Sequence, residues 1–394
     1  MSPPAETDGS ARPDVLLFFS DAGGGHRNAC SALVAAAEES GSPLRLRMVG
    51  LEEVLARWDL VRTLTGRSTE ETYNKLLRRG GTRFFVPLLR ALHGASALLH
   101  GPLVASVVRF LAAQPRPGAV VSVHPNFNRV LRDAVRQALP GVPFVVLLTD
   151  YADFPPHFWI EPGVDRVIAG SAHAALQALA LGVPPERITR TSGMVLHPRF
   201  HRGGGPGARE RVRAELGVPV DAFLVMVLFG GKGAAEMEPL SRALIEGSPA
   251  WHVLAICGNN PALLERLAPI EAASGKHLHS LGFTDRVADF MVASDALAAK
   301  PGPGVLAEAF HQRVPVIVTR NAFTIPQERY NARMVEEQGL GLVARDWQGI
   351  SAAARRLADD TALREAIRAR LVALPENRAV YEVLDVIAAE LRRP

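Results

Sequence analysis

Short, uninterrupted apolar runs, each followed by a segment with helical spacing, constrain the fold of this chain more than any other feature. They cover residues 15–19, 119–123, 144–148 and 166–169, and later residues 223–228, 252–256, 296–299 and 314–318. A strand without polar alternation is buried on both faces, as in a parallel sheet covered by helices. Strands of this kind alternating with helices predict βαβ units and an α/β fold.

The length of the chain and one interruption of the pattern predict two domains. At 394 residues the chain exceeds what a single core ordinarily holds. A Gly-, Pro- and Arg-rich stretch at 201–208 interrupts the strands and helices, which then begin again. We expect two Rossmann-like, doubly wound domains facing a cleft, where ligands would bind at the carboxyl ends of strands. The expected divisions are a disordered tail (1–13), a first domain (14–200), a linker (201–216), a second domain (217–375) and a helix packing back on the first domain (376–394).

The cysteines and the N-terminus indicate a cytoplasmic protein. Cys30 and Cys257 are the only cysteines, and they form neither a disulfide framework nor a metal-binding pattern. Residues 1–13 contain prolines and acidic residues in place of the basic and apolar regions of a signal peptide. The longest uncharged run, 91–108, contains His, Gly and Pro and makes a poor membrane span. We expect a soluble or peripheral protein.

Positive charge is modest overall but concentrated in one stretch. The net charge is +4, and Lys and Arg residues crowd positions 62–90 among apolar residues. No nucleic-acid-binding motif accompanies them, so we expect no nucleic-acid partner, whereas anionic lipid headgroups attract such a patch. In residues 73–112 the apolar positions keep helical spacing. Two interpretations stay open: helices that cover the first sheet, or a surface that seats on an anionic membrane and admits lipid.

A glycine-rich loop follows the first predicted strand. It reads Ser20-Asp21-Ala22-Gly23-Gly24-Gly25-His26-Arg27-Asn28 and precedes a helix predicted at 29–40. The three glycines permit close approach of the backbone to a ligand, and a helix N-terminus favours an anion. His26 is suited to accept a proton near neutral pH, with Asp21 as its helper. The loop predicts a catalytic site; the alternative is a tight turn with an incidental histidine.

A second loop joins a strand to a helix in the second half of the chain. It reads Lys300-Pro301-Gly302-Pro303-Gly304, and Glu308 follows about one turn into the helix. The amides at the start of that helix would hold a diphosphate. A carboxylate accepts hydrogen bonds from two adjacent hydroxyl groups, which suits Glu308 to a ribose. The alternative is an ordinary loop with a solvent-facing glutamate.

Three further segments carry weaker signals at strand ends. Gly230 and Gly231 permit another close approach, and Lys232 beside them is placed to balance phosphate charge. Gln327 and Glu328 lie on a predicted loop and suit sugar hydroxyls, although such residues on loops are usually solvated. The acceptor side of the cleft is predicted to contain three residues that follow strands of the first domain: His124, Asp150 and Tyr151. For His124 a core position is an equal alternative.

No metal is expected to take part. The sequence contains no Asp-x-Asp motif and no His, Asp or Glu cluster at metal-ligand spacing. Helix dipoles and a lysine, rather than Mg²⁺, would then take up the charge of a departing diphosphate.

Taken together, the motifs resemble the monogalactosyldiacylglycerol synthase and processive diacylglycerol glucosyltransferase group of glycosyltransferase family 28. The resemblance rests on 20–27, 122–125, 149–150 and 300–309, in order, within about residues 15–343. It implies the two-domain GT-B fold, a UDP-sugar donor, a lipid acceptor such as diacylglycerol, inversion at the anomeric carbon and no cofactor. It places His26 near the acceptor, Gly302, Gly304 and Glu308 at the uracil and ribose, and Gln327 with Glu328 at the sugar.

Two departures from the family pattern leave alternatives open. Lys232 stands where the family has small residues, and the acceptor segment at 58–110 matches only in character. The alternatives are a non-hydrolysing UDP-sugar 2-epimerase, a soluble natural-product glycosyltransferase and a non-catalytic UDP-sugar-binding regulator. The sugar stays open between glucose, galactose and N-acetylglucosamine. A lipid acceptor would place the protein peripherally on the inner face of the plasma membrane.

Overall fold

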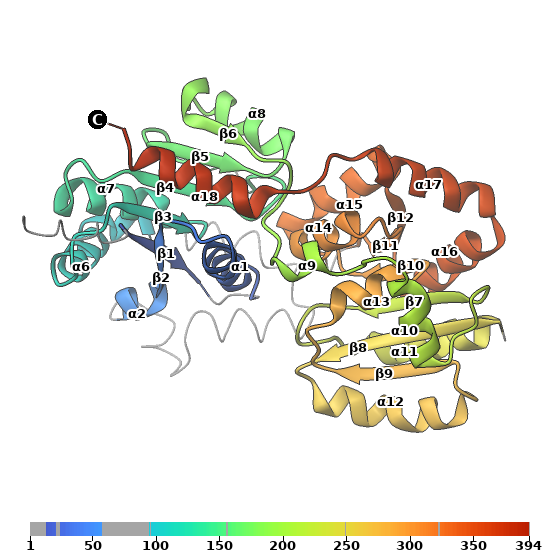
Figure 1. Cartoon of the computed structure of the whole chain (residues 1–394). Helices are drawn as coiled ribbons and strands as arrows, with labels where there is room; N and C mark the ends of the chain where they lie inside the picture. Colours follow the sequence, from blue (N-terminus) through green and yellow to red (C-terminus); the bar gives the residue numbers. More distant parts are fainter. Residues whose placement is uncertain are drawn as a thin grey trace, which may run out of the picture.

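The structure, a computed structural model, consists of two parallel six-stranded sheets with helices packed around each (Figure 1). It describes residues 13–20, 24–56, 94, 96–154, 157–248, 250–321 and 324–393. All strand pairs are parallel. The predicted α/β fold with two doubly wound domains is confirmed.

The N-terminal sheet has the strand order β2-β1-β3-β4-β5-β6. Its strands are β1 (Asp14–Phe19), β2 (Arg45–Gly50), β3 (Ala119–Val123), β4 (Phe144–Leu148), β5 (Arg166–Ala169) and β6 (Ile188–Arg190). The helices around it are α1 (Gly25–Glu39), α2 (Leu51–Leu55), α6 (His100–Ala112), α7 (Asn128–Ala138) and α8 (Ala172–Ala180). The order reverses between β1 and β3, which is therefore the topological switch point of this sheet.

Both faces of the N-terminal sheet are buried, because alternate residues of β1 enter separate cores. Leu16 and Phe18 pack with α6 and α7 in one core. Val15 and Leu17 pack with α1 in the other. This double burial is the reason that the central strands are apolar at every position.

The C-terminal sheet has the order β12-β11-β10-β7-β8-β9, which reverses between β7 and β10. Its strands are β7 (Phe223–Leu228), β8 (Trp251–Gly258), β9 (Leu278–Gly282), β10 (Ala296–Ala299), β11 (Val316–Thr319) and β12 (Gly341–Ala344). Its helices are α10 (Ala208–Leu216), α11 (Met237–Gly247), α12 (Pro261–Ala273), α13 (Val287–Ala293), α14 (Pro303–His311), α15 (Pro326–Gln338), α16 (Trp347–Asp359) and α17 (Thr361–Ala373).

The connection between the domains is shorter than the predicted linker 201–216. After the short helix α9 (Arg199–Arg202), helix α10 already belongs to the C-terminal domain. Arg213 on α10 is buried and donates to Asp295 Oδ2 at 2.8 Å, while Arg209 donates to Asp295 Oδ1 at 2.6 Å. Arginines that were predicted to belong to a polar linker are thus paired with an aspartate inside the C-terminal domain. Residues 203–207 connect α9 to α10.

The chain returns to the N-terminal domain through α18 (Ala379–Glu390), which lies across it in Figure 1. Val380, Val383 and Ile387 enter the same core as α1. At the far end of the helix, Arg166 Nε donates to Glu390 Oε1 at 2.7 Å, and both residues are buried. The C-terminal segment therefore ties the two domains together.

Part of segment 73–112, for which two interpretations stayed open, is a helix that packs on the first sheet. Leu103, Val107 and Leu111 of α6 are buried in the core with α7. Residues 73–93 and 95 lie outside the described residues. No helix among the ranges that the structure describes is long and apolar enough to cross a membrane.

Candidate active site

The predicted loops lie at the two topological switch points. In the N-terminal domain, the segments that follow β1 and β3 carry His26 and His124, whose ring centroids are 6.2 Å apart. In the C-terminal domain, the loops after β7 and β10 carry Phe229 and Lys300, and the Lys300 Nζ lies 5.9 Å from the Phe229 ring centroid. Switch points are where open α/β sheets bind ligands, because adjacent loops there diverge to opposite faces.

His26 lies in the first turn of α1, not in a loop before it. The helix begins at Gly25, and Gly24 before it has φ of +80°, a left-handed conformation that glycine adopts without strain. Gly24 and Gly25 thus place the imidazole at the N-terminus of a helix. Asp21 and Gly23, the other residues predicted for this loop, lie outside the described residues.

Three residues from other loops hold the His26 ring. Its Nδ1 lies 2.9 Å from the hydroxyl of Thr149, which follows β4. When Nδ1 donates this hydrogen bond, Nε2 carries the lone pair that accepts a proton. The Trp159 ring meets His26 edge to face with centroids 5.5 Å apart, and the His124 ring stacks with His26 at an interplanar angle of 25°.

Both histidines are neutral at physiological pH. Desolvation lowers the pKa of His26 to about 3, and the neighbouring His124 adds to the shift. Desolvation lowers the pKa of His124 to about 4. A neutral imidazole is able to accept a proton, but a base this weak needs a nearby negative charge to hold the proton.

We expect neither histidine to titrate between pH 5 and 8, because both pKa values lie below that range. Histidine NMR of the unliganded protein checks this, with the signals assigned through His26→Gln and His124→Gln. A titration midpoint near 6.5 for either ring would contradict the desolvated site.

Asp150 is connected to this group of rings through Trp159. Its Oδ2 accepts from Trp159 Nε1 at 2.8 Å, and burial raises its pKa to about 6. Trp159 is held in turn by Asp153, whose carboxylate accepts the Trp159 backbone N–H at 2.8 Å. Tyr151, predicted beside Asp150 on the acceptor side, is buried and belongs to the hydrophobic cluster that forms the C-terminal core.

The N-terminus of α14 forms the other half of the site. Gly302 is the N-cap and Pro303 the first helical residue, where a missing N–H costs nothing. The Leu306 N–H already bonds to Gly302 O, so the amides of Gly304 and Val305 are the ones that the helix leaves for an anion.

Glu308 lies on the same helix and is half-buried. Burial raises its pKa to about 7, and the positive charge of Arg199 on α9 opposes the shift. Partial desolvation makes a hydrogen bond from a ligand hydroxyl stronger than it would be in water.

Gln327 and Glu328 lie in the first turn of α15, and the loop predicted for them is wrong. Pro326 starts the helix, and Gln327 is buried with no partner for its Oε1 among the described residues. Burial raises the pKa of Glu328 to about 7; Lys300 opposes this shift and the Asp150 charge adds to it. Since Asp150 belongs to the other domain, the two halves of the site interact electrostatically.

Two hydrogen bonds from the segment after β8 hold the glycine loop that follows β7. Gly231 O accepts the Asn259 N–H at 2.8 Å, and the Lys232 O accepts from Asn260 Nδ2 at 3.0 Å. Gly230 has φ of +80°, which permits the turn. The Lys232 side chain is exposed, whereas Lys300 is the lysine that interacts with Glu328.

Four further residues belong to the site, and only Trp159 lies outside every segment that the sequence predicts for it. They are Thr149, Trp159, Lys300 and Asn331. Asn331 is fully buried on α15, and its Nδ2 donates to Pro301 O at 2.8 Å, which fixes the loop before α14. Thr149 and Lys300 lie in the predicted motifs, and Asn331 belongs to the predicted segment of Gln327 and Glu328, whereas nothing local marks Trp159.

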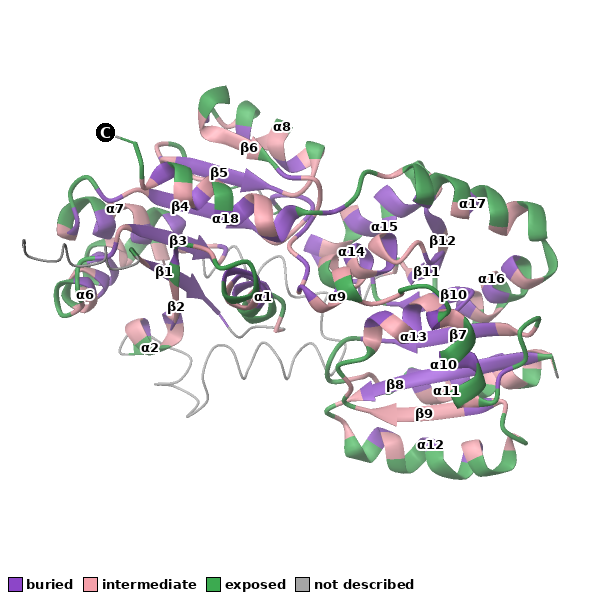
Figure 2. Cartoon of the chain, in the orientation of Figure 1, coloured by how far each residue is buried: buried purple, intermediate pink, exposed green. Residues whose placement is uncertain are grey.

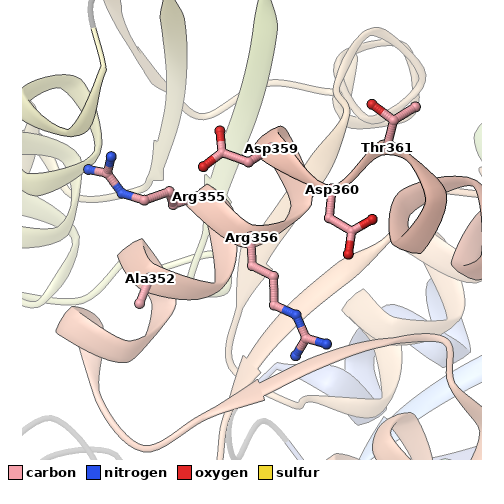
Figure 3. A pocket seen from close by; sticks show the side chains of 6 residues that line it. All are labelled: Ala352, Arg355, Arg356, Asp359, Asp360 and Thr361. Carbon is pink, nitrogen blue, oxygen red and sulfur yellow. The ribbon is translucent and has the colours of Figure 1, made fainter.

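A surface depression elsewhere on the C-terminal domain carries no part of this site. It has a volume of ≈ 580 Å³ and is lined by Ala352, Arg355, Arg356, Asp359, Asp360 and Thr361 (Figure 3). Because α16 runs back from the end of β12, its last turns lie at the amino ends of the strands, opposite α14's N-terminus. Asp360 caps α17 by accepting from the Leu363 N–H.

Comparison with known proteins identifies the family. The family model described as monogalactosyldiacylglycerol (MGDG) synthase matches residues 26–195. A rice relative (Oryza sativa subsp. japonica) named "Probable monogalactosyldiacylglycerol synthase 2, chloroplastic" is 30% identical over 356 residues, covering 86% of this chain and 72% of that protein. The chain belongs to the monogalactosyldiacylglycerol synthase family. Attaching a galactosyl group to diacylglycerol is a glycosyl transfer, and the chain is therefore a glycosyltransferase.

Solved structures show that this chain shares its fold with other proteins, but they do not show which reaction the chain catalyses. The calicheamicin glycosyltransferase CalG4 has a TM-score of 0.63 at 17% identity, with 97% of this chain and 99% of that one covered. The UDP-GlcNAc 2-epimerase of Neisseria meningitidis, bound to UDP-GlcNAc, has a TM-score of 0.61 at 11% identity, with 95% and 100% covered. Transferases and epimerases share this two-domain fold, so the family membership decides between them.

Proposed function

We propose that this protein transfers a hexose from a UDP-sugar to the hydroxyl group of diacylglycerol or a similar lipid. Its membership of the family supports the reaction class. The observation that carries the proposal further is the pairing of the two switch points: a neutral histidine cluster in one domain and a helix N-terminus with carboxylates in the other.

The proposed reaction is a single displacement with inversion. The acceptor hydroxyl oxygen forms a bond to the anomeric carbon while the bond from that carbon to the UDP oxygen breaks. The hydroxyl proton goes to Nε2 of His26, and the bonding electrons leave with UDP. The Thr149 hydroxyl at Nδ1 keeps the ring oriented for this transfer.

The C-terminal domain would hold the donor. The amides at the start of α14 would bind the diphosphate and stabilise the charge that develops on it. Glu308 would accept from the ribose hydroxyls, and Gln327 and Glu328 from those of the hexose. Helix amides would take up the charge without a metal ion, as the sequence predicts, with Lys300 in the role that was predicted for Lys232. A bound diphosphate would also bring negative charge toward His26 and raise its low proton affinity.

A membrane surface is part of the proposal. A diacylglycerol acceptor is confined to a bilayer, and the basic stretch 62–90, outside the described residues, carries the charge that anionic headgroups attract. A cytoplasmic location, on the inner face of the plasma membrane, stays a prediction of the sequence.

The test is transfer of label from a panel of UDP-hexoses to vesicles that contain diacylglycerol. We expect label in the lipid phase, and more of it on anionic than on neutral vesicles, with the difference shrinking as salt rises. Epimerised nucleotide without labelled lipid would instead show an isomerase. Nucleotide binding without any product would show a regulator.

A further inference from the structure

One aromatic contact joins the two domains beside the proposed site. The His173 ring in the first turn of α8 stacks on the Tyr330 ring of α15, with centroids 4.2 Å apart and an interplanar angle of 16°. Both side chains are half-buried. The Arg333 guanidinium lies 5.3 Å from the Tyr330 ring centroid and extends the stack by one more layer.

The His173 end of the stack is fixed to the acceptor half of the site. Ser171, the N-cap of α8, donates from its hydroxyl to Tyr151 O at 2.6 Å, and Tyr151 follows Asp150. One turn after His173, Gln177 makes two hydrogen bonds to the Asp153 backbone, at 2.8 and 3.0 Å. The first turns of α8 therefore move with the loop that carries Asp150.

The Tyr330 end is fixed to the donor half. Tyr330 follows Glu328 by two residues on α15 and precedes Asn331, which holds Pro301 O. Tyr330 also packs against the C-terminal core. A displacement of α15 relative to α8 would thus separate Glu328 and the loop at Gly302 from Asp150.

We propose that the His173–Tyr330 stack is a positioning contact of the transfer reaction, one that holds the two half-sites at the separation where acceptor and donor meet. The proposal rests on the proposed function. Neither residue reaches the reacting atoms in it; both act through α8 and α15. The stack favours the arrangement in which α8 and α15 are in contact, because the attraction between the two rings is lost when their separation grows.

The protonation state of His173 is compatible with the stack. Desolvation and the nearby Arg333 lower the pKa of His173, while Glu337 opposes the shift. The lowered pKa favours a neutral His173 ring at pH 7, and a neutral ring does not repel the nearby Arg333.

Steady-state kinetics of four variants test the proposal in the vesicle assay. We expect Tyr330→Leu and His173→Ala each to lower kcat about three- to tenfold, the range that one aromatic pair supplies. The double variant should be no worse than either single variant, because each change alone already breaks the stack. Tyr330→Phe keeps the ring and should match the unmodified protein.

A binding measurement and a control variant distinguish a positioning role of the stack from general damage to one domain. UDP affinity, measured by calorimetry, should stay within twofold in all variants, because the nucleotide contacts lie within the C-terminal domain. Leu176→Ala is the matched control, since Leu176 lies one turn along α8 and its side chain is 63% exposed. Additive losses in the double variant, or a loss in Leu176→Ala equal to that in His173→Ala, would overturn the proposal.

Small-angle X-ray scattering tests the contact without turnover, so its outcome does not depend on the proposed function. We expect Tyr330→Leu to have a larger radius of gyration than the unmodified protein and Tyr330→Phe to match it. Equal radii for all three proteins would overturn the proposal even if transfer is found. Absence of transfer in the unmodified protein, with a larger radius for Tyr330→Leu, would leave the contact established and remove its proposed role in this reaction.

Discussion

Replacement of His26 by alanine is expected to lower the turnover number by about 10²- to 10⁴-fold, the contribution of a positioned general base. His26 is half-buried at a helix N-terminus and its ring contacts the rings of His124 and Trp159, both at the site, so the fold should survive. UDP affinity should be unchanged, because the proposed nucleotide contacts lie in the other domain. Turnover in the vesicle assay and calorimetry with UDP give the two quantities.

Two further variants make the His26 result specific. His26→Gln retains a hydrogen-bonding group near Thr149 but cannot take a proton, so it should lose as much turnover as His26→Ala. His100→Ala is the matched control, because His100 pairs with Asp133 through a 2.9 Å contact away from the site. Turnover within threefold of normal in His26→Ala would remove His26 from the chemistry.

Replacement of Glu308 by alanine is expected to weaken UDP binding about ten- to a hundredfold, since hydrogen bonds to a charged group contribute about 1.5–3 kcal/mol. The half-buried carboxylate would otherwise bind the ribose hydroxyls. Because burial raises its pKa to about 7, the free protein holds a proton there below that pH. Ribose hydroxyls favour the ionised form, so UDP affinity should rise with pH up to about 7 and then level off.

The pH dependence distinguishes this role from a general disturbance. Calorimetry at pH 6, 7 and 8 should show the rise in the unmodified protein and lose it in Glu308→Ala. Glu215→Ala is the control, since that glutamate pairs with Arg286 on the surface of α10. An unaltered UDP affinity in Glu308→Ala at pH 8 would overturn the ribose assignment.

The central strands could be predicted from the sequence, and the edge strands could not. Strands β1, β3, β4 and β5, like β7, β8, β10 and β11, are buried nearly throughout and are read as apolar runs. Strands β2, β6, β9 and β12 end the two sheets and are partly exposed, as the edge strand β9 shows in Figure 2. Their mixed sequences, such as Arg45-Leu46-Arg47-Met48, lack the signal.

The loops of the candidate site could be predicted because glycine and proline mark them. The residues that orient those loops could not, since they come from distant segments. Trp159 reaches Asp150 only because Asp153 accepts the backbone N–H groups of the turn before it. Asn331 on α15 holds Pro301 through one buried hydrogen bond, thirty residues away in sequence. Contacts of this kind exist only in the folded chain.

Two helix starts were misplaced for opposite reasons. Helix α1 begins at Gly25, earlier than glycine's low helix propensity suggests. Helix α15 begins at Pro326, where proline in the first turn is a start signal that the sequence did contain. Both corrections move a predicted site residue, His26 or Glu328, from a loop into the first turn of a helix.

A crystal structure with a non-transferable UDP-sugar analogue tests most directly whether the two switch points hold opposite ends of one reaction. We predict the diphosphate at the amides that begin α14, the ribose at Glu308, and the anomeric carbon facing His26. About 6 Å should separate Nε2 of His26 from the anomeric carbon, which leaves room for one hydroxyl oxygen between them. An analogue bound in the N-terminal domain, or an anomeric carbon turned away from His26, would contradict the account.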